Sequence, residues 1–149
     1  TLSLHDALPI CRQRGQTTAL LLCDLDYFKR LNDSFGHPMG DQALIAFSQL
    51  TATLLRKHDL FARIGGEEFA CLLQGTDEQG AIQVAERIRQ GFASLDLLAP
   101  GFLSVSIGIV TTTPTCHDLS RLLSQADQAL YRAKDQGRNR VQTAICAAL

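Results

Sequence analysis

Along this chain, segments whose apolar residues are spaced as in a β-strand alternate with segments whose apolar residues are spaced as in an α-helix. Consecutive apolar positions from Ala19 to Leu25 predict a buried strand, and alternating ones predict another strand within Phe102 to Thr112. Apolar residues at helical spacing predict long helices between these strands. The helices are expected to begin at Pro38, after a capping box at Thr76-Asp77-Glu78-Gln79, and near Asp118.

The stretch from Leu60 to Leu73 has the pattern of a β-hairpin. Apolar runs flank Gly65-Gly66, and two adjacent glycines allow positive φ at both central residues of a tight turn. Glu67 and Glu68 follow directly, so we expect them at the exposed tip. Such a pair either holds a cation or a charged substrate, or belongs to an ordinary acidic surface turn.

The remaining segments complete an α/β pattern. Tyr27 to Phe35 predicts a short helix, and Asn139 to Ala144 predicts a last edge strand. The order strand, helix, hairpin, helix, strand, helix, strand predicts one domain with a mixed central β-sheet and helices on both faces. In such a domain the end of the first strand and the hairpin turn can be neighbours.

Composition indicates a soluble globular domain. Of the 149 residues, 46% are hydrophobic and 19% are charged, with a net charge of -1. This charge gives no pull toward nucleic acid or an anionic membrane, and no apolar run approaches the ~20 residues of a membrane span. The 5 cysteines include no C-x-x-C pair. We therefore expect a cytoplasmic protein without a disulfide framework or zinc site.

Residues 1–10 fit this pattern poorly. The decapeptide TLSLHDALPI looks like a translated reading frame of a sequencing adapter. We expect it to be a non-native leader, with the domain occupying residues 11–149. A genuine N-terminal tail is the alternative.

Acidic residues stand where the predicted strand and hairpin end. Asp24 and Asp26 close the first strand, which is unusual for a buried strand and indicates that both carboxylates face a site. If Asp24 lies opposite Glu67 and Glu68, their mutual repulsion favours a bound divalent cation such as Mg²⁺, together with substrate phosphates.

Taken in order, these segments resemble the GGDEF domain of diguanylate cyclases, which condense two GTP molecules into cyclic di-GMP. The resemblance covers about Ala19 to Val141. The matching motifs are Asp24 to Asp33, Gly36 to Asp41, Arg63 to Phe69, Ser106 to Gly108, Ala126 to Lys134, and Gly137 to Arg140. The resemblance implies a palm-like nucleotidyl-cyclase fold, Mg²⁺ or Mn²⁺ as cofactor, GTP and cyclic di-GMP as ligands, and an antiparallel homodimer.

The resemblance also assigns roles to individual residues. The expected metal ligands are Asp24, the Leu25 carbonyl and Glu67. The expected triphosphate contacts are Phe28, Lys29, Lys134 and Arg138, and the expected guanine contacts are Asn32 and Asp41. Gly65 and Gly66 are expected to let the nucleotide approach the turn closely. Glu68 is expected to assist the metal site or the attacking hydroxyl.

The segment Arg56-Lys57-His58-Asp59 admits two interpretations. Cations near a helix end followed by an acid can form a cap with a solvated ion pair. In the GGDEF family, however, an R-x-x-D five residues before the first glycine is the product-inhibition site, and this chain has that spacing. The resemblance therefore implies an allosteric site for cyclic di-GMP at Arg56 and Asp59.

The start of the chain departs from the family pattern. Members normally begin with a D-x-L-T-G-L-x-N-R type turn and a helix before the first strand, and neither is found in this sequence. We expect an N-terminally truncated domain whose upstream helix and regulatory domain, including any membrane anchor, are missing. Three functions stay open: a diguanylate cyclase, a non-catalytic domain that binds GTP or cyclic di-GMP, and another nucleotidyl cyclase with different chemistry.

Overall fold

The computed structural model of this chain describes residues 4, 6, 15–98, 101–113 and 118–145. Its centre is a five-stranded sheet of order β2-β3-β1-β4-β5. The strands are β1 (Thr18–Leu25), β2 (Leu60–Arg63), β3 (Glu68–Gln74), β4 (Val105–Thr111) and β5 (Val141–Ile145). The helices are α2 (Phe28–Phe35), α3 (His37–Leu54), α4 (Glu78–Ala93) and α5 (Leu119–Asp135).

The central strand β1 is hydrogen-bonded on both sides. It pairs antiparallel with β3 and with β4, whereas β5 joins the edge of β4 in parallel. Every residue of β1 is buried, as its uninterrupted apolar run predicts. The predicted mixed sheet is confirmed.

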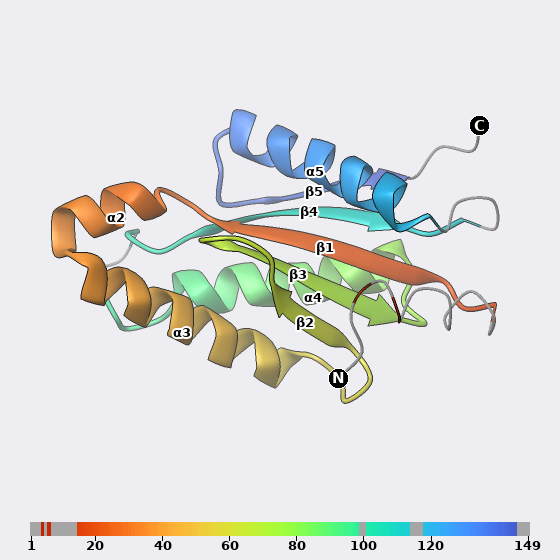
Figure 1. The fold of residues 1–149 in the computed structure, drawn as a ribbon, viewed down its shortest axis with the longest axis horizontal. Coiled ribbons are helices and arrows are strands. Elements are labelled where there is room, and N and C mark those ends of the chain that lie inside the picture. Colours follow the sequence, from red (N-terminus) through yellow and green to blue (C-terminus); the bar gives the residue numbers. More distant parts are fainter. Residues whose placement is uncertain (1–3, 5, 7–14, 99–100, 114–117, 146–149) are drawn as a thin grey trace.

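Side chains of β1 alternate between two hydrophobic clusters, one on each face of the sheet. Leu21 and Cys23 pack in the cluster that α3 and α4 cover. Leu20 and Leu22 pack in the cluster beneath α5. Helices therefore lie on both faces, as predicted, with α5 on the opposite side of the sheet from α3 and α4 (Figure 1). None of the described helices is long and apolar enough to cross a membrane.

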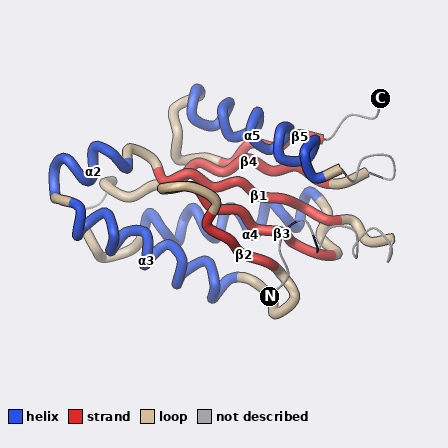
Figure 2. Tube along the Cα trace, viewed as in Figure 1, coloured by secondary structure: helices blue, strands red, loops and turns tan. Residues whose placement is uncertain are grey.

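Helix α2 lies beyond the end of β1, and α3 follows it. The chain leaves β1, forms α2, turns at Gly36 and returns as α3 along the sheet (Figure 2). Gly36 has φ 90°, a conformation that residues with a side chain rarely adopt. The expected start of this helix at Pro38 is confirmed to within one residue, but the helix ends at Leu54, before the cations Arg56 and Lys57.

The predicted caps and turns were only partly correct. The residue that caps α4 is Asp77 rather than Thr76, and its carboxylate accepts a hydrogen bond from the Gly80 amide at 2.9 Å. The prediction of positive φ in the hairpin was wrong, since neither Gly65 nor Gly66 is among the glycines with positive φ. The hairpin instead closes through a longer loop between Arg63 and Glu68.

Helix α5 lies unusually close to β4. A Cβ atom built on Gly108 would overlap two backbone atoms of α5, the Ala126 oxygen and the Leu130 nitrogen. Backbone atoms inside a helix cannot move aside as a flexible side chain can. Gly108 therefore sets the distance between α5 and the sheet, and α5 carries Lys134 toward the end of β1.

We predict that Gly108→Ala lowers the free energy of unfolding by about 2 kcal/mol or more, because α5 must move off the sheet. Urea unfolding of the parent and the variant measures this change. Gly66→Ala is the matched control, since a Cβ there would meet no atom within 4 Å. Equal destabilisation by the two substitutions would contradict this role of Gly108.

Candidate active site

The carboxylate of Asp24 lies at the end of β1, on the face of the sheet that α5 covers. Only 7% of its side chain is exposed, and its Oδ1 atom lies 2.9 Å from the Lys134 Nζ atom. The Lys134 ammonium therefore forms a charged contact with Oδ1, and Oδ1 has no other partner among the described residues. The strand thus ends on a buried carboxylate whose charge is matched by one ammonium group, that of Lys134.

Burial of Asp24 raises the pKa of its carboxyl group from 3.8 to about 6. The Lys134 ammonium lowers this pKa, and the negative charges of Glu67 and Glu68 raise it. The predicted neighbours are therefore close enough to influence the protonation of Asp24. One ammonium group does not fully offset the combined effect of burial and two nearby carboxylates.

The hairpin loop is attached directly to the end of β1. The Leu25 amide donates a hydrogen bond to the Glu67 carbonyl oxygen at 3.2 Å, and Asp24 pairs with Glu68 in the β-sheet register. Arg63 holds the loop from the other side by donating to the carbonyl oxygens of Gly65 and Gly66 at 3.1 and 2.7 Å. These bonds replace the tight glycine turn that the sequence predicts.

These residues fit a divalent cation that is also held by substrate phosphates. No group of three or more His, Cys, Asp or Glu side chains in the described part of the chain is arranged as a complete metal cage. Mg²⁺ commonly uses only one or two carboxylates and takes its other ligands from water and phosphate. The buried Asp24 carboxylate and the nearby Glu67 supply such a partial set.

Asp26, the acid just past the end of β1, does not face this site. Its two oxygens accept hydrogen bonds from the Ser106 hydroxyl at 2.6 Å, the Ser104 hydroxyl at 2.7 Å and the Asn139 amide at 3.0 Å. The prediction that both acids face one site was therefore wrong. Successive side chains of a strand point to opposite faces of the sheet, so the side chains of residues two positions apart normally lie on the same face. Asp26 lies just past the strand, where the chain turns into α2.

Arg138, a predicted phosphate contact, lies next to Tyr27. Its guanidinium carbon is 4.7 Å from the centre of the Tyr27 ring, and that of Arg30 is 5.4 Å away on the same ring. Tyr27 is 52% exposed and has a positive φ of 54°. The sequence pattern did not predict this contact of one aromatic ring with two arginines.

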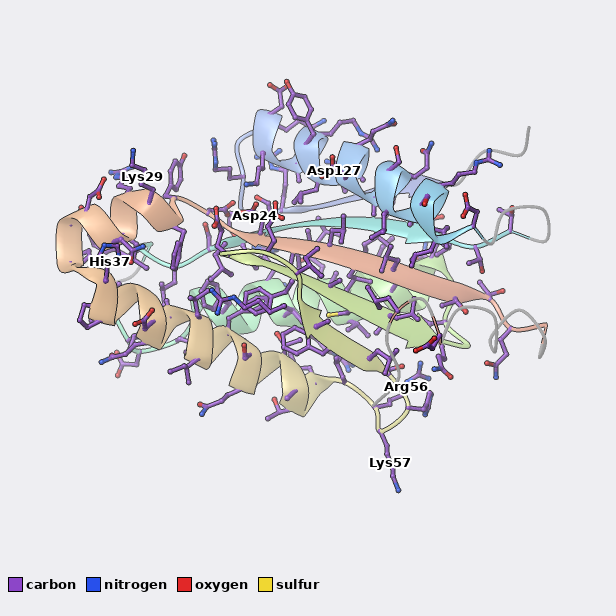
Figure 3. The ribbon with its side chains drawn as sticks, in the orientation of Figure 1. Asp24, Lys29, His37, Arg56, Lys57 and Asp127 are labelled. Atoms are coloured by element: carbon purple, nitrogen blue, oxygen red, sulfur yellow. The ribbon has the colours of Figure 1, made fainter. Side chains whose placement is uncertain are left out.

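The predicted guanine contacts lie where α2 meets α3. A Cβ atom on Gly40 would overlap the Asn32 side chain and would come within 3.2 Å of the Phe28 ring. Gly40 thus leaves space for Asn32, directly before Asp41 in α3. Asn32, Asp41 and Phe28 are accordingly brought to one end of the sheet. Lys29 is exposed on α2, and no ion pair involves it within the described residues (Figure 3).

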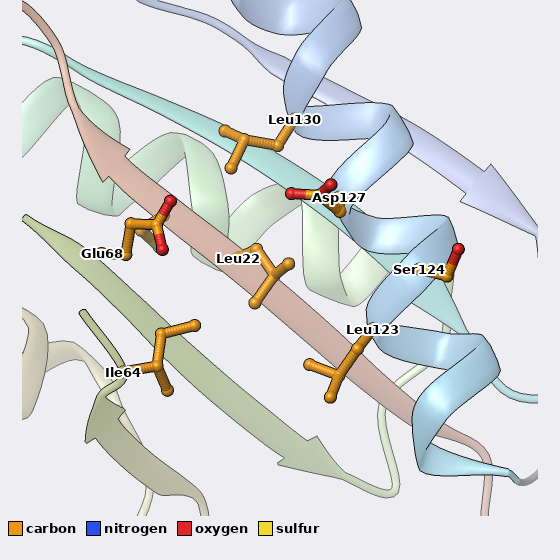
Figure 4. A pocket seen from close by; sticks show the side chains of 8 residues that line it. Leu22, Ile64, Glu68, Leu123, Ser124, Asp127 and Leu130 are labelled. Carbon is orange, nitrogen blue, oxygen red and sulfur yellow. The ribbon is translucent and has the colours of Figure 1, made fainter.

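A pocket of about 330 Å³ lies between the hairpin and α5, beside Glu68. Glu68 and Asp127 line this pocket above the apolar side chain of Leu22, with Leu130 on the next turn of α5 (Figure 4). Asp127 belongs to a motif that supported the resemblance, but its own role was not predicted. The structure places its carboxylate two turns before Lys134 on the helix that reaches Asp24.

Arg56 and Asp59 form a separate cluster at the other end of the hairpin. The Arg56 Nε atom lies 3.2 Å from Asp59 Oδ2. The Arg56 Nη2 atom donates to the Gln74 carbonyl oxygen and the Thr76 hydroxyl, each at 2.6 Å. Asp59 is nearly buried, with 3% of its side chain exposed, whereas 51% of the Arg56 side chain is exposed. The two predicted residues do meet, and Arg56 presents its outer edge to solvent.

The five-stranded mixed sheet with helices on both faces defines an α/β domain of the palm-like type. The family model for "Diguanylate cyclase, GGDEF domain" matches residues 1–140. The chain therefore belongs to the GGDEF domain family, as its motifs predict.

Individual relatives agree with this family. Probable diguanylate cyclase DgcC of Escherichia coli strain K12 is 37% identical over 143 residues, which are 95% of this chain and 38% of that protein. Diguanylate cyclase DgcM of the same strain is 41% identical over 130 residues, or 87% of this chain and 32% of that protein. The chain thus spans about a third of the length of these relatives.

Solved structures confirm the fold. The active GGEEF domain of a diguanylate cyclase from Vibrio cholerae has a TM-score of 0.87 and 33% identity, covering 96% of this chain and 91% of that one. The structure of the coiled coil and GGDEF domain of DgcB from Caulobacter crescentus, in complex with c-di-GMP, has a TM-score of 0.84 and 30% identity. The match covers 93% of this chain and 75% of that one.

The non-native origin of residues 1–10 stays a prediction. The family match includes them, and of these ten residues the structure describes Leu4 and Asp6. Leu4 is half-buried and packs against the cluster beneath α5. The individual roles of the site residues also stay predictions.

We predict that Asp24 makes the protein less stable as the pH rises. Its pKa is higher in the folded state, so the folded state binds more protons between about pH 4 and about pH 6, and stability falls as the pH rises through this window. At neutral pH, Asp24→Asn should be more stable than the parent by about 2 kcal/mol, and near pH 4 this difference should vanish.

Urea unfolding at a series of pH values tests this expectation, with exposed Asp33→Asn as the control. Saturating Mg²⁺ should reduce the difference between parent and Asp24→Asn, because a cation on the carboxylate competes with the proton. A pH-independent difference, or one that Mg²⁺ leaves unchanged, would argue against a metal-binding carboxylate at this position.

Proposed function

We propose that this domain is a diguanylate cyclase that condenses two GTP molecules into cyclic di-GMP and two pyrophosphates. The observation that carries this proposal is the buried Asp24 carboxylate, which forms an ion pair with Lys134 and lies near the acids of the hairpin. Burying an acid costs free energy, and a cation bound together with substrate phosphates would offset that cost. Membership of the GGDEF family supports the same chemistry.

Asp24, Glu67 and the Leu25 carbonyl oxygen would hold Mg²⁺, or Mn²⁺ in its place. When bound, such a cation neutralises charge on the reacting phosphate and favours formation of the attacking alkoxide. The chain's own contribution is to fix these ligands. The Leu25 amide and the Glu67 carbonyl oxygen are hydrogen-bonded at 3.2 Å, so the two predicted ligand segments move as one unit.

The base and the phosphates would occupy opposite sides of the β1–α2 connection. Asn32 and Asp41 offer an amide and a carboxylate to the guanine edge. Lys134 and Arg138 lie at the end of α5 and just beyond it, where their charges can offset the triphosphate. Phe28 and Lys29 begin α2 beside that path.

Condensation needs two such domains in an antiparallel homodimer. The 3′-oxygen of one GTP attacks the α-phosphorus of the other, a new phosphorus–oxygen bond forms, and pyrophosphate leaves. The proton of the hydroxyl passes to a nearby acceptor, for which we propose the Glu68 carboxylate. The same exchange in the opposite direction closes the ring. One domain supplies only one bound GTP, so a second copy must complete the site.

Incubation of the protein with Mg²⁺ and GTP, followed by mass spectrometry, tests the proposed reaction. We expect cyclic di-GMP and pyrophosphate, no cyclic product from ATP, and a rate that rises with the square of the protein concentration while dimers are scarce. Glu67→Gln should abolish product formation while GTP still binds. Tight GTP binding without any product would overturn the enzyme and leave a regulatory binding domain.

We further propose that cyclic di-GMP binds at Arg56 and Asp59 and inhibits the enzyme. The half-exposed Arg56 guanidinium and the Asp59 carboxylate suit a phosphate and a guanine edge. Progress curves should slow in the parent as product accumulates, and Arg56→Ala should remain closer to linear. Lys57→Ala, which changes the exposed neighbouring cation, should slow as the parent does. Equal slowing of the parent and Arg56→Ala would rule out this site.

A further inference from the structure

The turn that follows α5 has a backbone conformation that must be held in place. Gly137, Arg138 and Asn139 have φ values of 124°, 65° and 47°. Positive φ is unfavourable for residues with a side chain, and successive ones persist only where surrounding contacts enforce them. Arg138, the predicted phosphate contact, is the middle residue of this turn. The direction of the Arg138 side chain therefore depends on the contacts that hold this turn.

One set of contacts holds the turn from within the domain core. The Asn139 amide donates to Asp26 at 3.0 Å, and the Arg138 amide donates to the Ala133 carbonyl oxygen at 2.9 Å. Arg140 adds a bond from its Nε atom to the Arg138 carbonyl oxygen at 3.0 Å. These contacts fix the backbone but leave the Asn139 side chain to be held by another element.

That element is α4, through Arg89. The Arg89 Nη1 atom donates to the Asn139 Oδ1 atom at 3.1 Å, across 50 positions of the sequence. Its Nε and Nη2 atoms donate to Glu86 at 3.1 and 2.7 Å, which orients the guanidinium so that Nη1 faces the turn. The Arg89 side chain is only 21% exposed. It lies outside every motif that supported the resemblance.

We propose that Arg89 is a positioning residue for phosphate binding, because it holds Asn139 and thereby the turn that presents Arg138. This inference rests on the proposed function for its phosphate, but the holding of the turn can be measured without nucleotide. The alternative is that Arg89 only forms a surface ion pair with Glu86. In that case its loss would affect neither the turn nor the ligand.

The first measurement is hydrogen exchange of the Asn139 amide by nuclear magnetic resonance, without nucleotide. Arg89→Ala should raise its exchange rate about tenfold, since the turn opens more often once a charged hydrogen bond is lost. Amides of β1 should keep the parent rates, which excludes global destabilisation. The matched control is Arg87→Ala, an exposed arginine of the same helix, and it should leave the Asn139 rate unchanged.

The second measurement compares binding of GTP with binding of guanosine, which has no phosphates. Arg89→Ala should weaken GTP binding three- to tenfold and leave guanosine binding unchanged. It should have no further effect in an Arg138→Ala background, because two residues that act through one contact are not additive. Asn139→Asp retains the acceptor for Arg89 and should bind GTP better than Asn139→Ala.

An unchanged Asn139 exchange rate in Arg89→Ala would overturn the inference. So would an equal loss of guanosine binding, or a full additional loss in the Arg138→Ala background. If instead the exchange rate rises but the parent binds no GTP, Arg89 still holds the turn, and it is the proposed function that fails. The two failures are therefore distinguishable.

Discussion

The burial of Asp24 at the end of the central strand is the constraint on which the candidate site depends. A carboxylate with 7% of its side chain exposed loses most of its hydration, and two further acids on the adjacent hairpin add repulsion. The Lys134 ammonium offsets only part of this lost hydration and repulsion, as the raised pKa of Asp24 indicates. A fold selected for stability alone would neutralise or replace such an acid. Its free-energy cost is understandable if the site is complete only with a cation and a polyphosphate between these charges.

The position of Lys134 follows in turn from the packing of α5. The missing side chain of Gly108 lets the backbone of α5 lie against β4, and the helix then carries Lys134 to Asp24. Small displacements of a charge in a weakly hydrated site change its interaction energy strongly. A glycine in the sheet thus contributes to the electrostatics of a site that it does not touch.

The fold could be predicted from the sequence because its strands and helices carry clear apolar periods. The buried run of β1 and the apolar runs around Gly65-Gly66 placed the two acidic segments side by side, and the sheet register confirms it. Details that depend on tertiary contacts could not be predicted in the same way. Arg63 closes the hairpin loop through carbonyl oxygens, so its glycines need no positive φ. Likewise, the sequence suggests Thr76 as the helix cap, but in the structure the Thr76 hydroxyl accepts a hydrogen bond from Arg56.

Asp24 and Asp26 show why neighbouring residues of one motif need not share a role. Asp24 pairs with the Lys134 ammonium, whereas Asp26 accepts hydrogen bonds from two serine hydroxyls and the Asn139 amide. Side-chain identity cannot distinguish them, because the partners of Asp26 come from segments about 80 and 113 positions away. One strand end therefore organises both parts of the site. It offers Asp24 to a ligand, and through Asp26 it anchors the turn that carries Arg138.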